Sequence, residues 1–174
     1  IETFFQSVST TCHSMYTEYP LHGRELATQA VNDGATHIIS VGGDGTLNEV
    51  INGILQAEGH PVLGVIPAGS CNDFIKTIGI PRDFDTACRV AADGATIGCD
   101  VIQAGDRYFV NAAGIGFDVH VVEQTQKQRT RNGLSYLWTV LKNIFQYKAM
   151  HLNVINGKDY FEPKALMLTI ANGQ

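Results

Sequence analysis

The first half of the chain alternates between two spacings of hydrophobic residues. Four segments have apolar residues every three or four positions, the spacing of an amphipathic helix: residues 23–33, 47–57, 72–78 and 85–92. Continuous apolar runs at residues 37–41 and 61–66 are typical of strands buried in a parallel sheet. Because strands and helices alternate across short turns that contain glycine, the pattern predicts an α/β fold with layers of helix and sheet.

The second half has a different pattern, in which short extended segments predominate. These segments are residues 95–103, 108–112, 151–155 and 165–171. The pairs Gly105-Asp106 and Asn156-Gly157 lie between extended segments and are typical of hairpin turns. One helical stripe interrupts the series at residues 134–147. Its apolar side chains are expected to pack in a core rather than to line a groove for a ligand.

The change of pattern predicts a domain boundary near residues 94–98. Residues 1–96 are expected to form the layered α/β domain, and residues 97–174 the beginning of a β-rich, β-sandwich-like second domain. Since the pattern starts and stops in the middle of an element, parts of both domains are expected to lie outside the chain.

Composition restricts the class of protein. The 174 residues are 44% hydrophobic and 17% charged, an ordinary balance for a globular protein. No apolar run approaches the ~20 residues needed to cross a bilayer. A net charge of −5 without a basic stripe argues against binding to nucleic acid. The four cysteines form no CxxC pair, as expected for reduced thiols of a cytoplasmic protein.

The stretch Gly42-Gly43-Asp44-Gly45-Thr46 joins the first apolar run to the following helix. Ligands of open α/β sheets bind at such strand ends, where the free N–H groups of a helix N-terminus favour phosphate oxygens. Glycines let a phosphate approach the backbone, and the hydroxyl of Thr46 adds a donor. Asp44 suits this place if Mg²⁺ links it to the phosphates, through water or phosphate oxygens. The alternative is a tight turn in which Asp44 serves only as a cap.

A second loop, PAGSCNDF at residues 67–74, repeats this arrangement after the next apolar run. Gly69 is followed by the hydroxyl of Ser70 and then by Asn72 and Asp73, which open a helix. Two such loops after neighbouring parallel strands are expected to line one crevice from both sides. Ser70 or Asn72 can serve as a helix N-cap at the same time.

Four motifs in this order resemble the diacylglycerol kinase catalytic domain, most closely its bacterial soluble lipid-kinase branch. They are GGDGTLNEVING, PAGSCNDF, CDV at residues 99–101 and FVNAAGIGFD at residues 109–118. The resemblance covers residues 17–174, nearly the whole chain, and extends more distantly to NAD kinases. The combination of four ordered motifs is far more specific than any one of them.

The resemblance implies an ATP-dependent kinase that uses Mg²⁺ and phosphorylates a lipid hydroxyl such as that of diacylglycerol. It implies catalytic roles for Asp44, Asp73 and Asp100, the last through water behind the metal. The positions that it implies in nucleotide binding are Thr17, Gly42, Gly43, Asp44, Gly45, Thr46, Leu47, Asn48, Glu49, Gly69, Ser70 and Asn72. Ser70 stands where the family usually has threonine, so the hydroxyl is retained.

Two parts of the family pattern are expected to lie outside the chain. The first strand, with a nucleotide contact of its own, is expected before Ile1, and the general base with further metal ligands beyond Gln174. The chain alone is therefore expected to be inactive. The implied partners are ATP and a lipid alcohol, with peripheral attachment to the membrane surface and no nucleic acid. A homodimer is compatible with the resemblance.

Several positions have a second interpretation from the residues alone. Glu49 is expected to face either the ligand or solvent, and Asn48 either holds a metal-bound water or acts as a cap. Lys76 is expected to be a surface lysine rather than a phosphate contact. Asn111 is expected in a tightly packed crossing between domains. The polar and basic residues 124–132 form either a solvated loop or a contact for anionic lipid headgroups.

Two other classes of function compete with a lipid kinase. A kinase of NAD or of another small molecule would share the GGDG loop, although Asn72-Asp73-Phe74 directly after the second glycine loop favours the lipid branch. A nucleotide-sensing module with the same fold and no chemistry is the alternative outside enzymes. The sequence does not identify the acceptor lipid.

Overall fold

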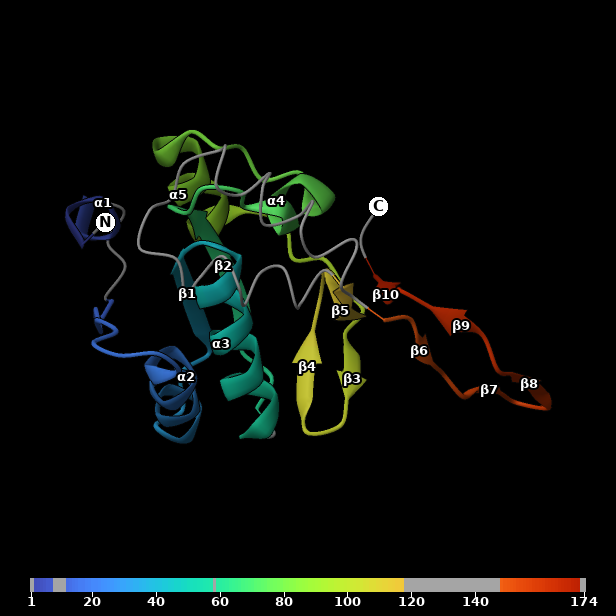
Figure 1. Ribbon diagram of the computed structural model, residues 1–174. Coiled ribbons are helices and arrows are strands. Elements are labelled where there is room, and N and C mark those ends of the chain that lie inside the picture. The colour runs from blue at the N-terminus through green and yellow to red at the C-terminus, as the bar shows by residue number, and fades with distance from the viewer. Residues whose placement is uncertain (1, 8–11, 58, 118–147, 173–174) are drawn as a thin grey trace. The chain divides into compact units, whose positions relative to one another are not determined.

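The computed structural model describes residues 2–7, 12–57, 59–117 and 148–172 (Figure 1). By its internal contacts the chain divides into two compact units, Ile1–Asn111 with Asn172–Gln174, and Ala112–Ala171. Residues 97–111, which the sequence pattern assigned to a second domain, thus have their contacts within the first unit. The assignment of residues 1–96 and 97–174 to two domains stays a prediction.

The first unit is built around a parallel pair of strands. β1 (His37–Gly42) pairs with β2 (Val62–Pro67), and Gly42 lies opposite Pro67 at the end of the pair. The helices of this unit are α1 (Glu2–Ser7), α2 (His22–Asn32), α3 (Asp44–Gln56), α4 (Asp73–Ile78) and α5 (Phe84–Asp93). The predicted α/β fold is confirmed. Because the two strands are parallel and in register, the loops that follow them leave the same edge of the sheet.

Helices cover both faces of the strand pair. Successive side chains of a strand point to opposite faces, and Ile38 and Ile39 of β1 pack in different clusters. Ile38 joins Val50 of α3 and Ala27 of α2, whereas Ile39 joins Cys88 of α5. Figure 1 shows α3 packed along the strand pair. The first unit is therefore a helix–sheet–helix sandwich, as the buried, continuously apolar strands predict.

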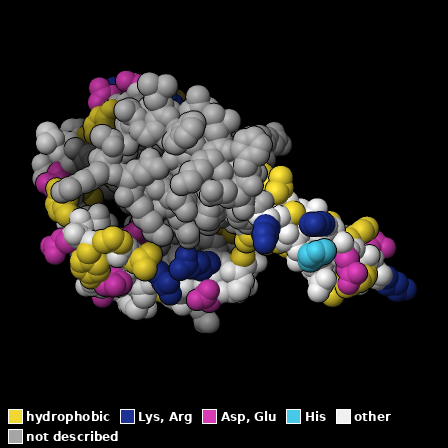
Figure 2. Space-filling model, viewed as in Figure 1, with side chains coloured by type: hydrophobic (Ala, Val, Ile, Leu, Met, Phe, Trp, Pro, Cys, Tyr) yellow, Lys and Arg dark blue, Asp and Glu magenta, His cyan; other side chains and the backbone are white. Residues whose placement is uncertain are grey.

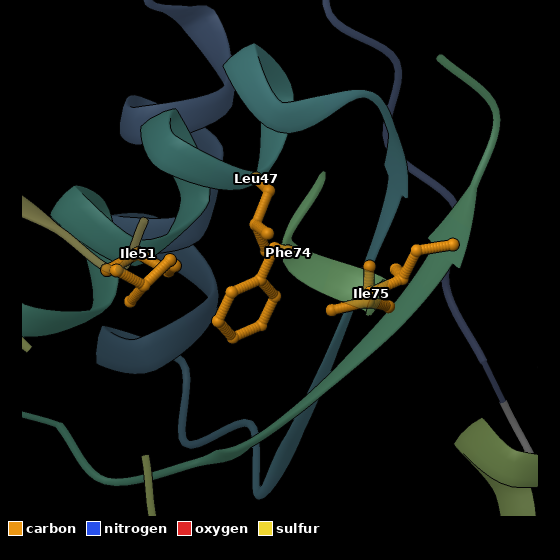
Figure 3. Close-up of a cluster of buried hydrophobic side chains, with 6 residues drawn as sticks. Leu47, Ile51, Phe74 and Ile75 are labelled. Atoms are coloured by element: carbon orange, nitrogen blue, oxygen red, sulfur yellow. The ribbon is translucent and has the colours of Figure 1, made fainter. Parts of the chain in front are cut away.

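The third cluster lies beneath the two glycine loops. Leu47 and Ile51 of α3 pack against Phe74 and Ile75 of α4, and all four side chains are at most 5% exposed (Figure 3). Burial of one such side chain stabilises a fold by about 1.5–3 kcal/mol. Leu47 and Phe74 belong to the first turns of their helices. The hydrophobic core thus holds the N-terminal ends of α3 and α4 together.

Helix α3 begins earlier than its hydrophobic stripe predicts. The stripe starts at Leu47, but the helix starts at Asp44, so Asp44, Gly45 and Thr46 also belong to its first turn. A glycine inside a helix costs about 1 kcal/mol relative to alanine, and it carries no apolar side chain to continue the stripe. The glycine-rich motif therefore lies partly in the helix rather than wholly in a loop.

Two short strands complete the first unit. β3 (Ile102–Ala104) and β4 (Arg107–Phe109) form an antiparallel hairpin, and the predicted turn at Gly105-Asp106 is confirmed, with φ +63° at Gly105. The predicted strand over residues 95–103 is wrong for most of its length, because regular structure begins only at Ile102. Residues 95–101 are exposed, so their β-forming side chains gain no burial from a strand.

The second unit consists of antiparallel strand pairs. β5 (Ala112–Gly116) pairs with β10 (Met167–Ala171). The remaining pairs are β6 (Met150–His151) with β9 (Lys164–Ala165) and β7 (Val154–Asn156) with β8 (Asp159–Phe161). Each of the predicted strands over residues 108–112, 151–155 and 165–171 is divided between two shorter strands. Periodicity does not show such interruptions, because the intervening residues keep the alternation of the strands.

The hairpin signal at Asn156-Gly157 is confirmed, with Gly157 and Lys158 as the turn residues and φ +60° at Gly157. Hydrophobic side chains stay exposed near this turn, among them Ile155 at 72% and Tyr160 at 55%. Residues 148–165, which contain β6 to β9, form a β-ribbon, and Figure 2 shows hydrophobic side chains beside charged ones along it. The predicted helix at residues 134–147 and the basic loop at residues 124–132 lie outside the described residues.

Candidate functional site

The N-terminus of α3 offers unpaired backbone donors. Gly43 occupies the N-cap position in an extended conformation and provides no side-chain cap, while its carbonyl accepts from the N–H of Leu47 at 3.0 Å. The first N–H groups of an α-helix have no partner within the helix. Those of Asp44, Gly45 and Thr46 therefore lie at the positive end of a 13-residue helix, an arrangement that favours an anion.

Gly45 is a glycine that the fold itself does not require. A Cβ added at Gly45 would meet no atom within 4 Å, and its φ is not positive. Glycine inside a helix is unfavourable, so its presence has no explanation in packing or in backbone geometry. The open space above this residue is where a ligand can approach the free N–H groups.

Gly43 and Gly69, by contrast, are required because the two loops touch. A Cβ on Gly69 would lie 2.4 Å from the Cα of Gly43, and one on Gly43 would lie 3.2 Å from the Cα of Gly69. A Cβ on Gly42 would lie 2.6 Å from the Oγ1 of Thr46. Glycine at positions 43 and 69 thus allows the loop after β1 to pack against the loop after β2, and glycine at position 42 leaves room for the side chain of Thr46.

Asp44 binds the start of the neighbouring helix instead of capping its own. Its Oδ1 accepts hydrogen bonds from the backbone N–H groups of Asp73 at 2.8 Å and Phe74 at 3.2 Å. The side-chain amide of Asn111 donates to the same oxygen at 3.5 Å. The first N–H groups of α4 are therefore occupied, so the two loops are not equivalent. The unpaired donors belong to the first loop.

Asn72 closes the second loop on itself. It is 7% exposed, has φ +48°, and its Oδ1 accepts from the N–H of Gly69 at 3.0 Å. Its Nδ2 donates to the carbonyl of the same residue at 2.7 Å. A buried amide needs such partners, and here they set the conformation of the loop. Ser70, inside this loop, is exposed.

Charged side chains around the second loop are engaged at the surface. The carboxylate of Asp73 forms an ion pair with Lys76, and both side chains are mostly exposed, at 60% and 58%. The guanidinium of Arg82 donates to the carbonyl of Cys71 at 2.6 Å. Lys76 is thus a surface lysine in this structure. The contact of Arg82 connects the segment after α4 to the loop before it, and sequence reasoning did not single it out.

Glu49 caps the start of α2, a role that neither interpretation of the sequence included. Its two carboxylate oxygens accept from the N–H groups of Leu21 and Gly23, each at 3.0 Å. Thr17 lies beside this contact, since a Cβ added at Gly23 would be 3.6 Å from the Cγ2 of Thr17 and 2.9 Å from a carboxylate oxygen of Glu49. The structure therefore brings Thr17 and Glu49 together beside the start of α2.

Amide side chains along α3 hold the β3–β4 hairpin. Asn52 is 5% exposed and pairs with both backbone groups of Tyr108, accepting from its N–H at 2.9 Å and donating to its carbonyl at 2.8 Å. Asn48 donates to the same carbonyl at 3.0 Å, and Gln56 to that of Asp106 at 3.3 Å. Asn52 is a polar residue within the apolar stripe of a helix, a signal that could have identified it. Asn48 acts here as an anchor of the hairpin.

Asp100 is exposed and is linked to the glycine loops only through other residues. Its backbone carbonyl accepts from the side-chain amide of Asn172 at 2.6 Å. Partial desolvation, and then the carboxylate of Asp100, raise the pKa of the Cys99 thiol above its usual 9.0, so this thiol stays protonated at neutral pH.

The side chains at this site can bind a metal ion only if phosphate or water oxygens complete the coordination of the metal. Among the described residues, no group of three or more His, Cys, Asp or Glu side chains could hold a metal ion. Mg²⁺ is commonly bound through one or two carboxylates together with phosphate oxygens and water. Asp44 at the mouth of the first loop satisfies that requirement, since only its Oδ1 is bonded to the residues named above.

Comparison with known proteins gives one consistent family. The diacylglycerol kinase catalytic domain family matches residues 1–104. A Cronobacter sakazakii protein named "Probable lipid kinase YegS-like" is 31% identical over 84% of this chain and 51% of that protein. A Staphylococcus aureus protein named "Diacylglycerol kinase" is 35% identical over 81% of this chain and 45% of that protein.

Solved structures show the same fold. The crystal structure of a diacylglycerol kinase from Bacillus anthracis is similar over 99% of this chain and 59% of that one, with a TM-score of 0.72 and 23% sequence identity. The chain spans about half the length of the curated relatives it matches, at 51% and 45% of their lengths.

Proposed function

Because the chain belongs to the diacylglycerol kinase catalytic domain family, we propose that it provides the nucleotide-binding side of an ATP-dependent lipid kinase. The observation that carries this proposal is the start of α3. Its first N–H groups have no partner within the helix. Gly45 leaves open space beside these groups, although neither packing nor backbone geometry requires a glycine there. The triphosphate of ATP is the anion that the family and this geometry together favour.

The proposed roles of the two loops differ. Gly43, Asp44, Gly45 and Thr46 bind phosphate oxygens through the backbone, and Thr46 adds a hydroxyl. Mg²⁺, held by Asp44 through water or phosphate oxygens, would neutralise charge on the transferred phosphoryl group. The second loop, closed by Asn72 and packed on the first at Gly69, keeps the first loop in place.

The remaining predicted positions belong to the proposal in two groups. Asp73 and Asp100 are proposed to complete the acidic network of the active site. Further contacts to the nucleotide are proposed for Thr17, Gly42, Leu47, Asn48, Glu49, Gly69, Ser70 and Asn72. For buried or backbone-bonded members of this set, such as Asn72 and Glu49, the contacts described above support an indirect effect on the nucleotide.

The acceptor is proposed to be a lipid alcohol, as the names of the relatives suggest. Such a substrate resides in a bilayer, so the kinase is proposed to attach peripherally to the membrane from the cytoplasmic side. Among the described helices, none is both long and apolar enough to cross a membrane. A homodimer also belongs to this proposal.

Transfer of radiolabelled phosphate from ATP tests the proposal. The complete protein is incubated with Mg²⁺, labelled ATP and a panel that contains diacylglycerol, other lipid alcohols and NAD, and Gly45→Val serves as the variant with a blocked loop. Labelled lipid that disappears in Gly45→Val supports the proposal. Labelled NAD would show a small-molecule kinase instead, whereas ATP binding by calorimetry without any labelled acceptor would favour a regulatory module.

A further inference from the structure

Two asparagines mark the points at which the chain leaves the first unit and returns to it. Asn111 is the last residue before the second unit, and Asn172 is the first residue after it. The backbone N–H of Asn172 donates to the backbone carbonyl of Asn111 at 2.6 Å. The side-chain amide of Asn172 donates to the carbonyls of Asp100 at 2.6 Å and Val110 at 3.3 Å. The exit, the return and the segment at Asp100 are thus held together within the first unit.

The side chain of Asn111 extends this connection to the first glycine loop. Its Nδ2 donates to Oδ1 of Asp44 at 3.5 Å, the longest of the three bonds to that oxygen. The terminal torsion of an aspartate side chain is broad and has no sharp preference of its own. The donors around Oδ1 therefore decide where the second oxygen, Oδ2, points.

The position of Asn111 is itself fixed from α3. Tyr108, shortly before Asn111, has both backbone groups paired with the buried side chain of Asn52. Because Asn52 and Asp44 belong to the same helix, the amide of Asn111 and the carboxylate of Asp44 are held against one rigid element. A rigid support of this kind is what an oriented side chain in a site requires.

We propose that Asn111 and Asn172 are positioning residues of the kinase site, an inference that rests on the proposed function. Asn111 orients the carboxylate of Asp44 toward the phosphates and their metal ion, and Asn172 holds the backbone at Asp100. A neutral amide suits this role, because it donates a hydrogen bond to Asp44 without cancelling its charge. The two segments that join the units thereby control two of the three acids that the family pattern implies.

The test uses single variants of the complete protein that each remove one link. Asn111→Ala removes the bond to Asp44 and keeps the backbone carbonyl that accepts from Asn172. Asn172→Ala removes the bond to Asp100 and keeps its own N–H. The matched control is Asn32→Ala, at an exposed asparagine at the end of α2. We expect kcat to fall about tenfold in both single variants, with KM for the lipid unchanged, and to stay at the parent value in the control.

A charge substitution separates positioning from a purely structural role. Asn111→Asp places a second carboxyl next to Asp44, and two carboxylates so close share a proton or repel each other. An ionised carboxylate at this position cannot donate a hydrogen bond to Asp44, so kcat should fall at least as far as in Asn111→Ala. Parent kcat in Asn111→Asp would contradict the proposed orientation of Asp44.

A measurement without catalysis keeps the inference separate from the proposed function. The free energy of unfolding is measured for Asp44→Ala, Asn111→Ala and the double variant, which should be non-additive if the two side chains interact. Additive effects together with parent turnover in Asn111→Ala would overturn the inference. If the parent protein phosphorylates no acceptor, the proposed function fails. The double-mutant cycle on the free energy of unfolding still decides whether Asn111 interacts with Asp44.

Discussion

In the proposed site, Asp44 would combine a structural and a chemical role, because a carboxylate has two oxygens. Its Oδ1 accepts from the first N–H groups of α4, and the charge of the group remains available to a metal ion beside the phosphates. The two roles respond differently to substitution, because an asparagine keeps an acceptor oxygen and loses the charge. Substitution at this position can therefore distinguish an effect on the fold from an effect on the site.

We expect Asp44→Ala to lower the free energy of unfolding by about 1–2 kcal/mol, since the N–H groups of Asp73 and Phe74 lose a charged acceptor. Asp44→Asn should lower the free energy of unfolding clearly less, because the asparagine keeps an acceptor oxygen. In the complete protein, both variants should also lose the proposed Mg²⁺-dependent phosphoryl transfer. Denaturant unfolding and turnover at saturating Mg²⁺ check the two expectations. Near-parent turnover in a folded Asp44→Asn variant would show that the metal assignment is wrong.

Gly45 and Gly69 make a matched pair for testing the phosphate loop. Gly45→Ala adds a methyl group in open space within a helix, so stability should rise by about 0.5 kcal/mol while ATP affinity falls. Gly69→Ala forces a methyl group to within 2.4 Å of the Cα of Gly43, so the fold should lose about 2 kcal/mol. Thermal unfolding measures the change in stability, and calorimetry with ATP measures the change in affinity. Unchanged ATP affinity in Gly45→Ala would remove the main support for this loop as the phosphate site.

Leu21 adopts a conformation that suits glycine better. It has φ +70° and is 52% exposed, so it gains little burial for the strain. A left-handed conformation costs an ordinary residue about 1 kcal/mol. Leu21→Gly should raise the free energy of unfolding by up to about 1 kcal/mol, and its N–H can still donate to Glu49. Leu21→Ala is the control, and equal stability of the Gly and Ala variants would contradict the argument.

Among the helices, α5 has a capping contact that predicts a pH dependence. Asp83 precedes the helix, and its carboxylate accepts from the hydroxyl of Thr86 at 2.6 Å and from its N–H at 2.9 Å. The side-chain bond from Thr86 and then the backbone bond hold the pKa of Asp83 below its usual 3.8. The unfolded chain therefore binds this proton at a higher pH than the folded chain does. The stabilisation is present above pH 3.8 and is lost as the pH falls through the folded pKa.

We expect Asp83→Asn to keep a capped α5 and to lose this part of the pH dependence. The free energy of unfolding is compared at about pH 5 and about pH 3 for the parent and the variant. The parent should lose more stability on acidification than the variant. Asp93→Asn, at the other end of the same helix, is the control. Identical losses in the parent and Asp83→Asn would show that the cap contributes no pH dependence.

Helices α2 to α5 and strands β1 and β2 of the first unit could be predicted because each has its own pattern of apolar residues. The stripe through Leu47, Ile51 and Ile54 identifies α3, and the apolar run that includes Ile38 and Ile39 identifies β1. The strand predicted over residues 95–103 failed because its side chains find no partner to bury against. Local pattern predicts an element only where tertiary contacts support it.

The motifs of the site could be predicted from the sequence, but the hydrogen bonds between its residues could not. The glycine loops follow from their position after parallel strands, and the structure places them in contact at Gly43 and Gly69. The bonds from Asp44 to α4, from Glu49 to α2 and from Asn52 to Tyr108 join residues far apart in the sequence. Such bonds depend on the packed arrangement of elements, which spacing along the chain does not contain.

For the complete protein, the proposed lipid acceptor makes a membrane surface the expected site of action. A kinase whose acceptor is a lipid must reach the bilayer, and peripheral contact combines exposed apolar side chains with attraction between basic residues and anionic headgroups. Lys127, Arg129 and Arg131 form the basic group that the sequence indicates. They lie outside the described residues, so this expectation depends on the sequence alone.

We expect replacement of Lys127, Arg129 and Arg131 by alanine to weaken binding to anionic vesicles at low salt. Each basic residue near an anionic surface contributes about 1 kcal/mol, and salt screens this attraction. Co-sedimentation with vesicles at low and high salt measures the effect in the complete protein. The matched control replaces three exposed lysines of the second unit by alanine and removes the same charge: Lys148, Lys158 and Lys164. If the control loses binding and the first variant keeps it, the basic residues of the β-ribbon form the docking surface and residues 124–132 do not. Equal loss in both variants would mean that net charge, rather than a defined surface, attracts the protein to the membrane.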